Sequence, residues 1–250
     1  MTVVLVHGNP ETAAIWDPLR AELGRDDVVA LSPPGFGAPV PAGFGGSSDD
    51  YAAWLVDELA ARVTDGPIDL VGHDWGGGHV MRAAAARPDL IRSWVTDIAG
   101  CMHPDYVWHD MAQVWQTPGA GEDAVAALAA TQNEQLVQAY EGLGMTATAA
   151  RSCAAAATAD MGRCILALYR SAAQPQMATW GRELAAADRR PALVIIPTED
   201  HFTGGEALAR DMARQLGADV TVLDGLGHWW MLQDPARGAA ALAQFWSPLA

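Results

Sequence analysis

The stretch from residue 68 to residue 78, which reads I-D-L-V-G-H-D-W-G-G-G, constrains the fold of this chain more than any other. A short apolar run ends in Gly72, a polar pair and a tryptophan follow, and the glycines lead into an alanine-rich segment. This pattern predicts a buried strand, a tight turn and the start of a helix. Small residues on both sides of Asp74 allow the backbone to bend sharply there and to raise one side chain above the strand. Asp74 is therefore a candidate nucleophile, and the alternative is a turn whose aspartate only caps the helix.

Apolar runs that end in turn-forming residues occur on both sides of this stretch and alternate with helical patterns. The first run is apolar without alternation, which is typical of a strand buried on both faces of a parallel sheet. We expect strands at residues 2–6, 28–31, 68–71, 91–98, 192–196 and 219–223. We expect helices between and after them at residues 12–23, 51–63, 79–87, 206–215 and 235–245. Repeated alternation of this kind predicts a mostly parallel sheet with helices on both faces.

The alternation breaks after the fourth expected strand. From about residue 101 to residue 188 the chain is alanine-rich and predicts only helices, near residues 122–130, 133–140 and 153–171. The sequence therefore predicts an α/β fold with about six strands, a core made of residues 1–100 and 189–250, and a helical cap at residues 101–188.

Composition excludes several classes of function. Half of the 250 residues are hydrophobic, and the net charge of -15 argues against binding to nucleic acid or to anionic membrane surfaces. Three cysteines without metal-ligand spacing are expected to be reduced thiols. An apolar run begins at Thr2, which leaves no room for a signal peptide, and no stretch reaches membrane-spanning length. We expect a globular, cytoplasmic protein that acts on a small apolar molecule; its oligomeric state stays open.

Polar and aromatic residues gather where the expected strands end. The carboxyl ends of parallel strands form the usual functional edge of an open α/β sheet. The residues expected at this edge are Asn9, Asp74, Trp75, Asp97, Asp200 and His228. Asp74, an acid and His228 follow one another in the chain order nucleophile, acid, histidine.

Three motifs carry a resemblance to a known family. They are His7-Gly8-Asn9-Pro10 after the first strand, Gly72-His73-Asp74-Trp75-Gly76 at the turn, and Gly227-His228 after the last strand. With them the chain resembles α/β-hydrolases, and within that fold the branch with an aspartate nucleophile, which holds haloalkane dehalogenases, haloacetate dehalogenases and epoxide hydrolases. The resemblance implies a covalent alkyl ester on Asp74, which His228 hydrolyses by activating water. It implies no cofactor and no metal.

The resemblance leaves the partner of His228 open. Asp200 follows the fifth expected strand, where the usual pattern of the fold places the acid. Asp97 ends the fourth, where one subgroup of haloalkane dehalogenases and the haloacetate dehalogenases place it. We favour Asp200 from the order of the elements.

The leaving group is also open. Haloalkane dehalogenases that resemble this chain hold the departing halide with an asparagine and a tryptophan at the positions of Asn9 and Trp75, which favours dehalogenation here. Epoxide hydrolases instead protonate the epoxide oxygen with cap tyrosines, for which Tyr106, Tyr140 and Tyr169 are candidates. An esterase-like hydrolase and a ligand-binding homologue without catalysis remain as further alternatives.

Overall fold

A computed structural model gives the fold, and it describes residues 2–63 and 66–249. These residues form one parallel sheet of six strands in the order β2-β1-β3-β4-β5-β6. The strands are β1 (Val3–Val6), β2 (Val28–Leu31), β3 (Ile68–Gly72), β4 (Ile91–Thr96), β5 (Ala192–Pro197) and β6 (Asp219–Leu223). All six expected strands are confirmed, and because every pairing is parallel, their carboxyl ends meet at one edge.

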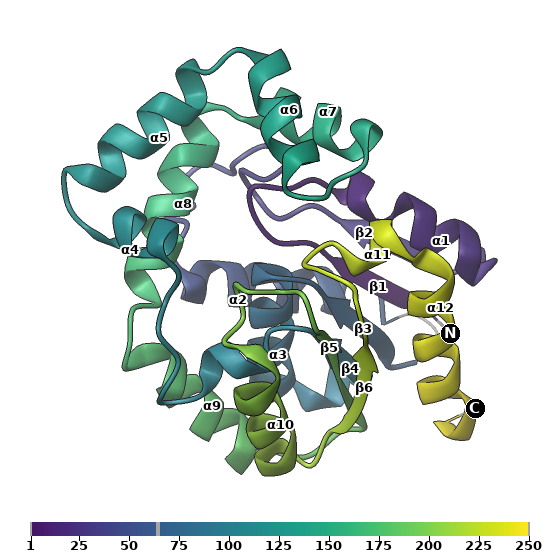
Figure 1. The fold of residues 1–250 in the computed structure, drawn as a ribbon. Coiled ribbons are helices and arrows are strands. Elements are labelled where there is room, and N and C mark those ends of the chain that lie inside the picture. The colour runs from purple at the N-terminus through teal and green to yellow at the C-terminus, as the bar shows by residue number, and fades with distance from the viewer. Residues whose placement is uncertain (1, 64–65, 250) are drawn as a thin grey trace.

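Helices cover both faces of the sheet (Figure 1). On one face lie α1 (Asp17–Leu23) and α12 (Pro235–Trp246), which pack against each other; on the other lie α2 (Ser48–Ala60), α3 (Trp75–Ala86), α9 (Gln176–Ala186) and α10 (Gly205–Leu216). Alternate residues of β1 serve the two faces, since Val4 and Val6 pack on the α3 side while Val3 and Leu5 pack on the α12 side. The apolar strands are thus buried on both faces, as their sequences predict.

The long segment between β4 and β5 is helical, as expected. It contains α4 (Asp110–Gln116), α5 (Ala120–Ala130), α6 (Asn133–Gly142), α7 (Ala147–Ala156) and α8 (Ala159–Ser171), followed by α9. Figure 1 shows α5, α6 and α7 together on the side of the molecule opposite α9 and α10. The Thr12 and Ser152 hydroxyls lie 2.8 Å apart and tie α7 to the loop after β1. Residues 101–188 as a separate cap remain a prediction, since α9 lies inside that range yet packs against α3 and α10.

The expected single helix at residues 153–171 is wrong, because the chain breaks there into α7 and α8. Thr158 lies between them with extended backbone, and its side chain accepts a hydrogen bond from the backbone N–H of Met161. A threonine in this position caps the start of a new helix instead of continuing the previous one. The helical pattern alone does not reveal the break because the apolar spacing continues across it.

Short helical segments complete the fold. They are the 3₁₀ turns η1 (Ala13–Trp16), η2 (Pro88–Leu90), η3 (Ala99–Met102) and η4 (Ser247–Leu249), and the four-residue helix α11 (Trp230–Gln233). None of the helices in the described part of the chain has the length and apolarity of a membrane-spanning segment.

Candidate active site

Asp74 stands on a sharp turn between β3 and α3. Its φ of 49° makes it the only non-glycine residue with a positive φ among those described. The turn needs small neighbours, because a Cβ on Gly76 would lie 2.1 Å from the carbonyl oxygen of Val6, and one on Gly72 would lie 2.5 Å from that of Gly76. The glycine-rich sequence therefore permits the close approach of three backbone segments, with the aspartate raised at the carboxyl edge of the sheet.

The two carboxylate oxygens of Asp74 have different surroundings. Oδ1 accepts a hydrogen bond of 3.0 Å from the backbone N–H of Asn9, in the loop after β1. Oδ2 lies 4.0 Å from Nε2 of His228. Burial raises the pKa of Asp74 to about 6, although the positive charge of His228 opposes the rise. The carboxylate is thus anchored through one oxygen and faces a histidine with the other.

His228 is oriented by Asp200, the acid that the order of elements favours. Its Nδ1 lies 2.8 Å from Oδ2 of Asp200, whose Oδ1 accepts a hydrogen bond of 2.9 Å from the backbone N–H of Phe202. Burial lowers the pKa of His228, but the charge and hydrogen bond of Asp200 and the charge of Asp74 together outweigh it, and the net direction is upward. The pKa of Asp200 falls because the charge of His228 and its hydrogen bond outweigh the burial of the acid. This contact also fixes which nitrogen of the ring faces Asp74.

Asp97, the other candidate partner of His228, contacts different groups. Its Oδ2 lies 2.5 Å from Nδ1 of His73 and accepts a hydrogen bond of 2.8 Å from the indole N–H of Trp230. Its Oδ1 accepts the backbone N–H of Asp74 at 3.0 Å. Asp97 therefore stabilises the turn through the backbone N–H of Asp74, and its contacts are with His73 and Trp230 instead of His228.

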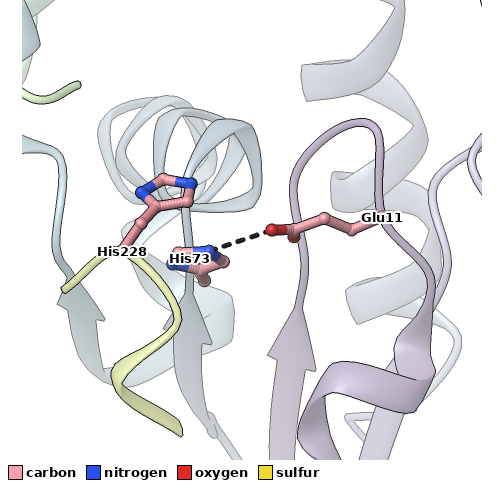
Figure 2. A group of neighbouring side chains, drawn as sticks. All are labelled: Glu11, His73 and His228. Atoms are coloured by element: carbon pink, nitrogen blue, oxygen red, sulfur yellow. Dashed lines mark hydrogen bonds and ion pairs between the residues drawn. The ribbon is translucent and has the colours of Figure 1, made fainter. Parts of the chain in front are cut away.

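Glu11 is not among the predicted site residues, yet it is fully buried beside His73 and His228 (Figure 2). Its Oε1 lies 3.1 Å from Nε2 of His73 and accepts the indole N–H of Trp229, while Oε2 accepts the backbone N–H of Gly8 at 3.0 Å. Burial alone would raise the pKa of Glu11, but the charge and hydrogen bond of His73 and the charges of His228 and His7 together lower it to about 2. The only hint in the sequence is that a charged residue directly follows the Asn9-Pro10 turn.

His73 holds a proton on each ring nitrogen, because each nitrogen faces a carboxylate. Burial lowers its pKa, but the charges of Asp97 and Glu11 outweigh this and raise it well above the usual value. Glu11, His73 and His228 also offer metal-ligand atoms within 4.8 Å of one another. Since both nitrogens of His73 are engaged by acids, these residues form a charge network, and we assign no metal to them.

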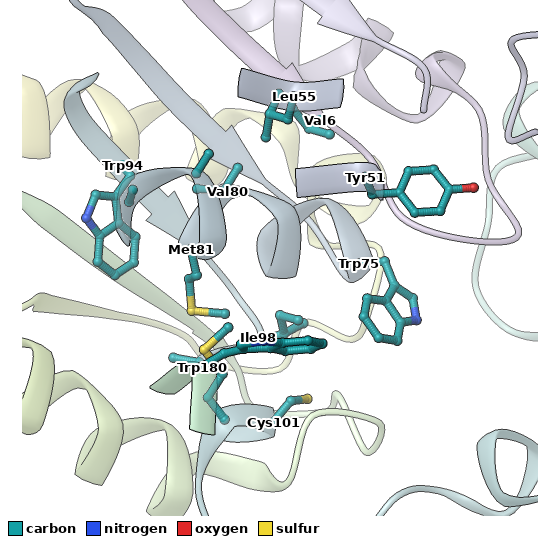
Figure 3. Close-up of a cluster of buried hydrophobic side chains, with 14 of the residues drawn as sticks. Val6, Tyr51, Leu55, Trp75, Val80, Met81, Trp94, Ile98, Cys101 and Trp180 are labelled. Carbon is teal, nitrogen blue, oxygen red and sulfur yellow. The ribbon is translucent and has the colours of Figure 1, made fainter. Parts of the chain in front are cut away.

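Aromatic side chains close the space in front of Asp74. The cavity is small: the space open to the centre of a water molecule measures about 20 Å³, roughly what one water molecule needs. Trp75 and Trp108 stack with ring centroids 5.7 Å apart, and Tyr169 meets Trp75 edge-on at 5.1 Å. Trp75, Ile98 and Cys101 reach it from the buried cluster around α3 (Figure 3). The rest of the lining consists of Tyr106, His109, Met177, Phe202 and Thr203.

Of the two predicted halide donors, Trp75 lines this cavity and Asn9 is not among its lining residues. The indole N–H of Trp108 and the side-chain amide of Asn9 are buried without a partner among the described residues. Tyr106 and Tyr169 line the cavity, but the hydroxyl of Tyr106 already donates to the carbonyl of Phe202 at 2.7 Å. Tyr140 is buried in the other core cluster, beyond the cavity lining. Two of the three candidate tyrosines thus lie near Asp74.

A larger cleft of about 550 Å³ adjoins the cavity on the side of His228. Phe202 and His228 line it together with Leu143 at the end of α6, and Phe202 lines both spaces. The ring of Phe202 stands edge-on to that of His228, with centroids 5.1 Å apart. Another cleft, of about 630 Å³ between the loop after β2 and α7, includes none of the residues around Asp74 and is not part of this site.

Comparisons with known proteins agree with the fold. The profile of the alpha/beta hydrolase family matches residues 3–241. Lipase LipV of Mycobacterium tuberculosis is 34% identical over 100 residues, which cover 37% of this chain and 35% of the lipase. The (E)-2-((N-methylformamido)methylene)succinate hydrolase of Acinetobacter baylyi is 28% identical over 91 residues, covering 36% and 34%. These matches span only about a third of the length of each curated relative.

Solved structures resemble the whole chain. A loop variant of the haloalkane dehalogenase DbeA from Bradyrhizobium elkanii has a TM-score of 0.74 at 20% identity, covering 100% of this chain and 91% of the other. The epoxide hydrolase CorEH has a TM-score of 0.78 at 17% identity, covering 100% and 92%. At such low identity the likeness concerns the fold. Together with the family match over nearly all residues, it establishes that this chain belongs to the alpha/beta hydrolase family.

Proposed function

We propose that the protein is a hydrolase that forms a covalent alkyl ester on Asp74, with His228 as base and Asp200 as its partner. This proposal rests on the unequal environment of the Asp74 carboxylate, whose Oδ1 accepts the N–H of Asn9 and whose Oδ2 faces His228. A carboxylate placed in this way suits attack on saturated carbon, whereas esters and amides are usually attacked by a hydroxyl or thiol.

In the first step Oδ2 of Asp74 attacks the substrate carbon. The new C–O bond forms as the bond to the leaving atom breaks, and the bonding electron pair departs with that atom. Asp74 must be an anion for this step. The small cavity leaves little water to compete with the substrate for the carboxylate.

In the second step His228 takes a proton from a water molecule as the water oxygen attacks Cγ of Asp74. The negative charge that develops on Oδ1 is stabilised by the backbone N–H of Asn9, which already contacts this atom. Collapse breaks the bond between Cγ and the alkoxide oxygen, and the alkoxide receives the proton from His228. The carboxyl group then loses its remaining proton to solvent, which restores Asp74. Asp200 stabilises the transient His228 cation.

A haloalkane is the substrate class that we place first. A departing halide is an anion that needs N–H donors in a dry site. Trp75 and Trp108 stack in the cavity wall, and the N–H of Trp108 has no partner among the described residues. The buried amide of Asn9 is likewise without a partner in that part of the chain. These donors support a small, apolar halogenated substrate, and we keep the expectation of a cytoplasmic protein without nucleic-acid or membrane partners.

Epoxide hydrolysis is the second candidate, because Tyr169 lines the same cavity as Asp74. An opened epoxide leaves an alkoxide, which a tyrosine hydroxyl can protonate. The hydroxyl of Tyr106 is engaged by Phe202, so Tyr169 would carry most of this task in the closed cavity.

The test replaces His228 by glutamine and incubates the variant separately with a bromoalkane and an epoxide. Without the base the ester should accumulate, so the intact mass should rise by the alkyl or hydroxyalkyl group, with the adduct on Asp74. His201→Gln is the matched control, since His201 is an exposed neighbour that should leave turnover intact. A folded His228→Gln variant that gains no mass from either reagent would contradict the proposal and favour an esterase or a ligand-binding protein.

A further inference from the structure

Glu11 joins the three loops that carry the proposed reaction. It lies in the loop after β1, and its two oxygens bind Gly8 from that loop, His73 beside the nucleophile, and Trp229 beside the base. Figure 2 shows the contact with His73. Gly8 directly precedes Asn9, whose N–H holds Oδ1 of Asp74. Each of these contacts is therefore one residue away from a group that acts in the reaction.

The network continues from Glu11 to the nucleophile itself. His73 also contacts Asp97, which accepts a hydrogen bond from the backbone N–H of Asp74. Asp97 also binds Trp230, so the segment after His228 is held at two adjacent tryptophans, one by each acid. Two buried acids with one histidine between them thus fix the turn, the loop after β1 and the loop of the base relative to one another.

We infer that Glu11 is a positioning residue of this hydrolase, which holds the Asn9 N–H, the nucleophile and the base in place relative to one another. This inference rests on the proposed function. Glu11 itself touches no reacting atom, because its oxygens are occupied by Gly8, His73 and Trp229.

A carboxylate suits this position better than an amide would. Both oxygens of Glu11 accept hydrogen bonds, from three donors in all. A glutamine has one acceptor oxygen, and its NH₂ group would face one of these N–H donors. Glu11→Gln should therefore weaken either the contact with the N–H of Gly8 or the contacts with His73 and Trp229. Loss of the Gly8 contact should also displace the neighbouring N–H of Asn9.

The charge of Glu11 also acts on Asp74, since a nearby negative charge opposes formation of a second one. Besides Glu11, the titratable groups that face Asp74 or its partner His228 are His73, Asp97, Asp200, His109, Tyr106, Tyr169 and Cys101. Asp97 lies 2.5 Å from His73 and keeps it protonated without Glu11. Glu11→Gln therefore removes one negative charge and leaves the His73 cation in place.

The experiment measures the pH dependence of kcat/KM for Glu11→Gln with the substrate that alkylates Asp74. The acidic limb should move to lower pH by roughly one unit, because Asp74 ionises more readily. In single turnovers, hydrolysis of the ester should slow by roughly tenfold or more, and alkylation by less, since the Asn9 N–H serves the hydrolysis step. Loss of packing alone would not shift the pH limb.

Asp69→Asn is the matched control. Asp69 is another fully buried acid, on the same strand as the turn, but it binds Arg92 and Ser93 away from the site. This variant should lose stability and keep the limb in place. NMR of the His73 ring N–H protons in Glu11→Gln gives a readout without turnover, and they should remain on a charged ring.

The outcomes separate this inference from the proposed function. If His228→Gln forms the Asp74 adduct while Glu11→Gln keeps both the pH limb and the hydrolysis rate of the wild type, Glu11 is not a positioning residue. If Asp69→Asn shifts the limb equally, the effect does not belong to Glu11 either. If no adduct forms in His228→Gln, the proposed function fails first, and the inference falls with it.

Discussion

Gly8 lies so close to Asp74 that a Cβ atom built on the glycine would stand 2.0 Å from Oδ1 of the carboxylate. The atoms that such a Cβ would meet first all belong to the Asp74 side chain. The absence of a side chain at residue 8 is therefore what allows the carboxylate to reach the N–H of Asn9.

Gly8→Ala should displace the nucleophile while the sheet stays intact. A carboxylate that moves by about an ångström is expected to lose about 100-fold in kcat/KM. Halide release or diol formation measures the activity, and circular dichroism checks the fold. Gly142→Ala is the control, because nothing lies within 4 Å of the added Cβ there. Equal activity of Gly8→Ala and the wild type would show that the position of Oδ1 is unimportant.

The roles of the two acids can be separated by Asp200→Asn and Asp97→Asn. Asp200→Asn leaves the ring of His228 without its anionic partner, so ester hydrolysis should slow by about 1000-fold or more and the adduct on Asp74 should accumulate. Asp97→Asn should instead cost about 3 kcal/mol of unfolding free energy, because it leaves the buried His73 cation with Glu11 alone. Rapid-quench mass spectrometry and thermal unfolding distinguish the two, and the reverse pattern would make Asp97 the partner of the base His228.

Activity should fall in mild acid. Burial raises the pKa of Asp74 to about 6, so the carboxylate becomes protonated, and non-nucleophilic, as the pH falls through that value. We expect kcat/KM to decrease about tenfold for each pH unit below it. A profile measured with a neutral substrate checks this, since the substrate does not titrate. A flat profile down to pH 4 would mean that the attacking group is not this carboxylate.

Stability should also fall in stronger acid, through Glu11. Its folded-state pKa is about 2, below the usual 4.5, so it stabilises the fold above the usual value and this contribution is lost as the pH falls toward 2. The loss should reach roughly 3 kcal/mol, an order of magnitude that follows from the size of the shift. Thermal unfolding between pH 5 and pH 2 measures it, and Glu11→Gln should show a smaller slope over the same range.

Phe202 lines both the closed cavity and the outer cleft. Phe202→Ala should raise kcat/KM several-fold for long-chain substrates and change it little for the smallest ones, because the ring no longer fills the passage. Leu143→Ala is the contrast, since Leu143 is 58% exposed and lines the same cleft but not the cavity. A uniform loss for all substrate lengths would mean that Phe202 instead holds His228 in place.

The sequence predicts the parts of this site that follow from the sheet. A strand that ends in small residues before an acid, and a histidine after the last strand, indicate where Asp74 and His228 lie. The same pattern cannot decide between Asp97 and Asp200, because both end neighbouring strands and only side-chain directions separate them. Glu11 stays hidden for another reason: its contacts reach 62 residues along the chain to His73 and 218 to Trp229, and no local pattern records such pairs.

The sequence names candidate tyrosines but cannot predict which aromatic side chains line the cavity, for a similar reason. Trp108, Tyr106 and Tyr169 come from irregular or helical parts of the segment after β4, where spacing shows which residues are buried but not what they face. By contrast, the capping of α2 by Ser47 is local: the Ser47 side chain accepts the backbone N–H of Asp50, and the Asp50 side chain accepts the backbone N–H of Ser47.

Cys101 lines the cavity beside the nucleophile, and burial raises the pKa of its thiol well above the usual value. A thiolate would be the stronger competitor for an alkylating substrate, but a neutral thiol reacts slowly. An electrophile that enters this space therefore meets one ionised nucleophile, the carboxylate of Asp74. Water can hydrolyse the ester that forms on this carboxylate. A thioether on Cys101 would be permanent, so by keeping this sulfur protonated the fold protects the protein from inactivation by its own substrate.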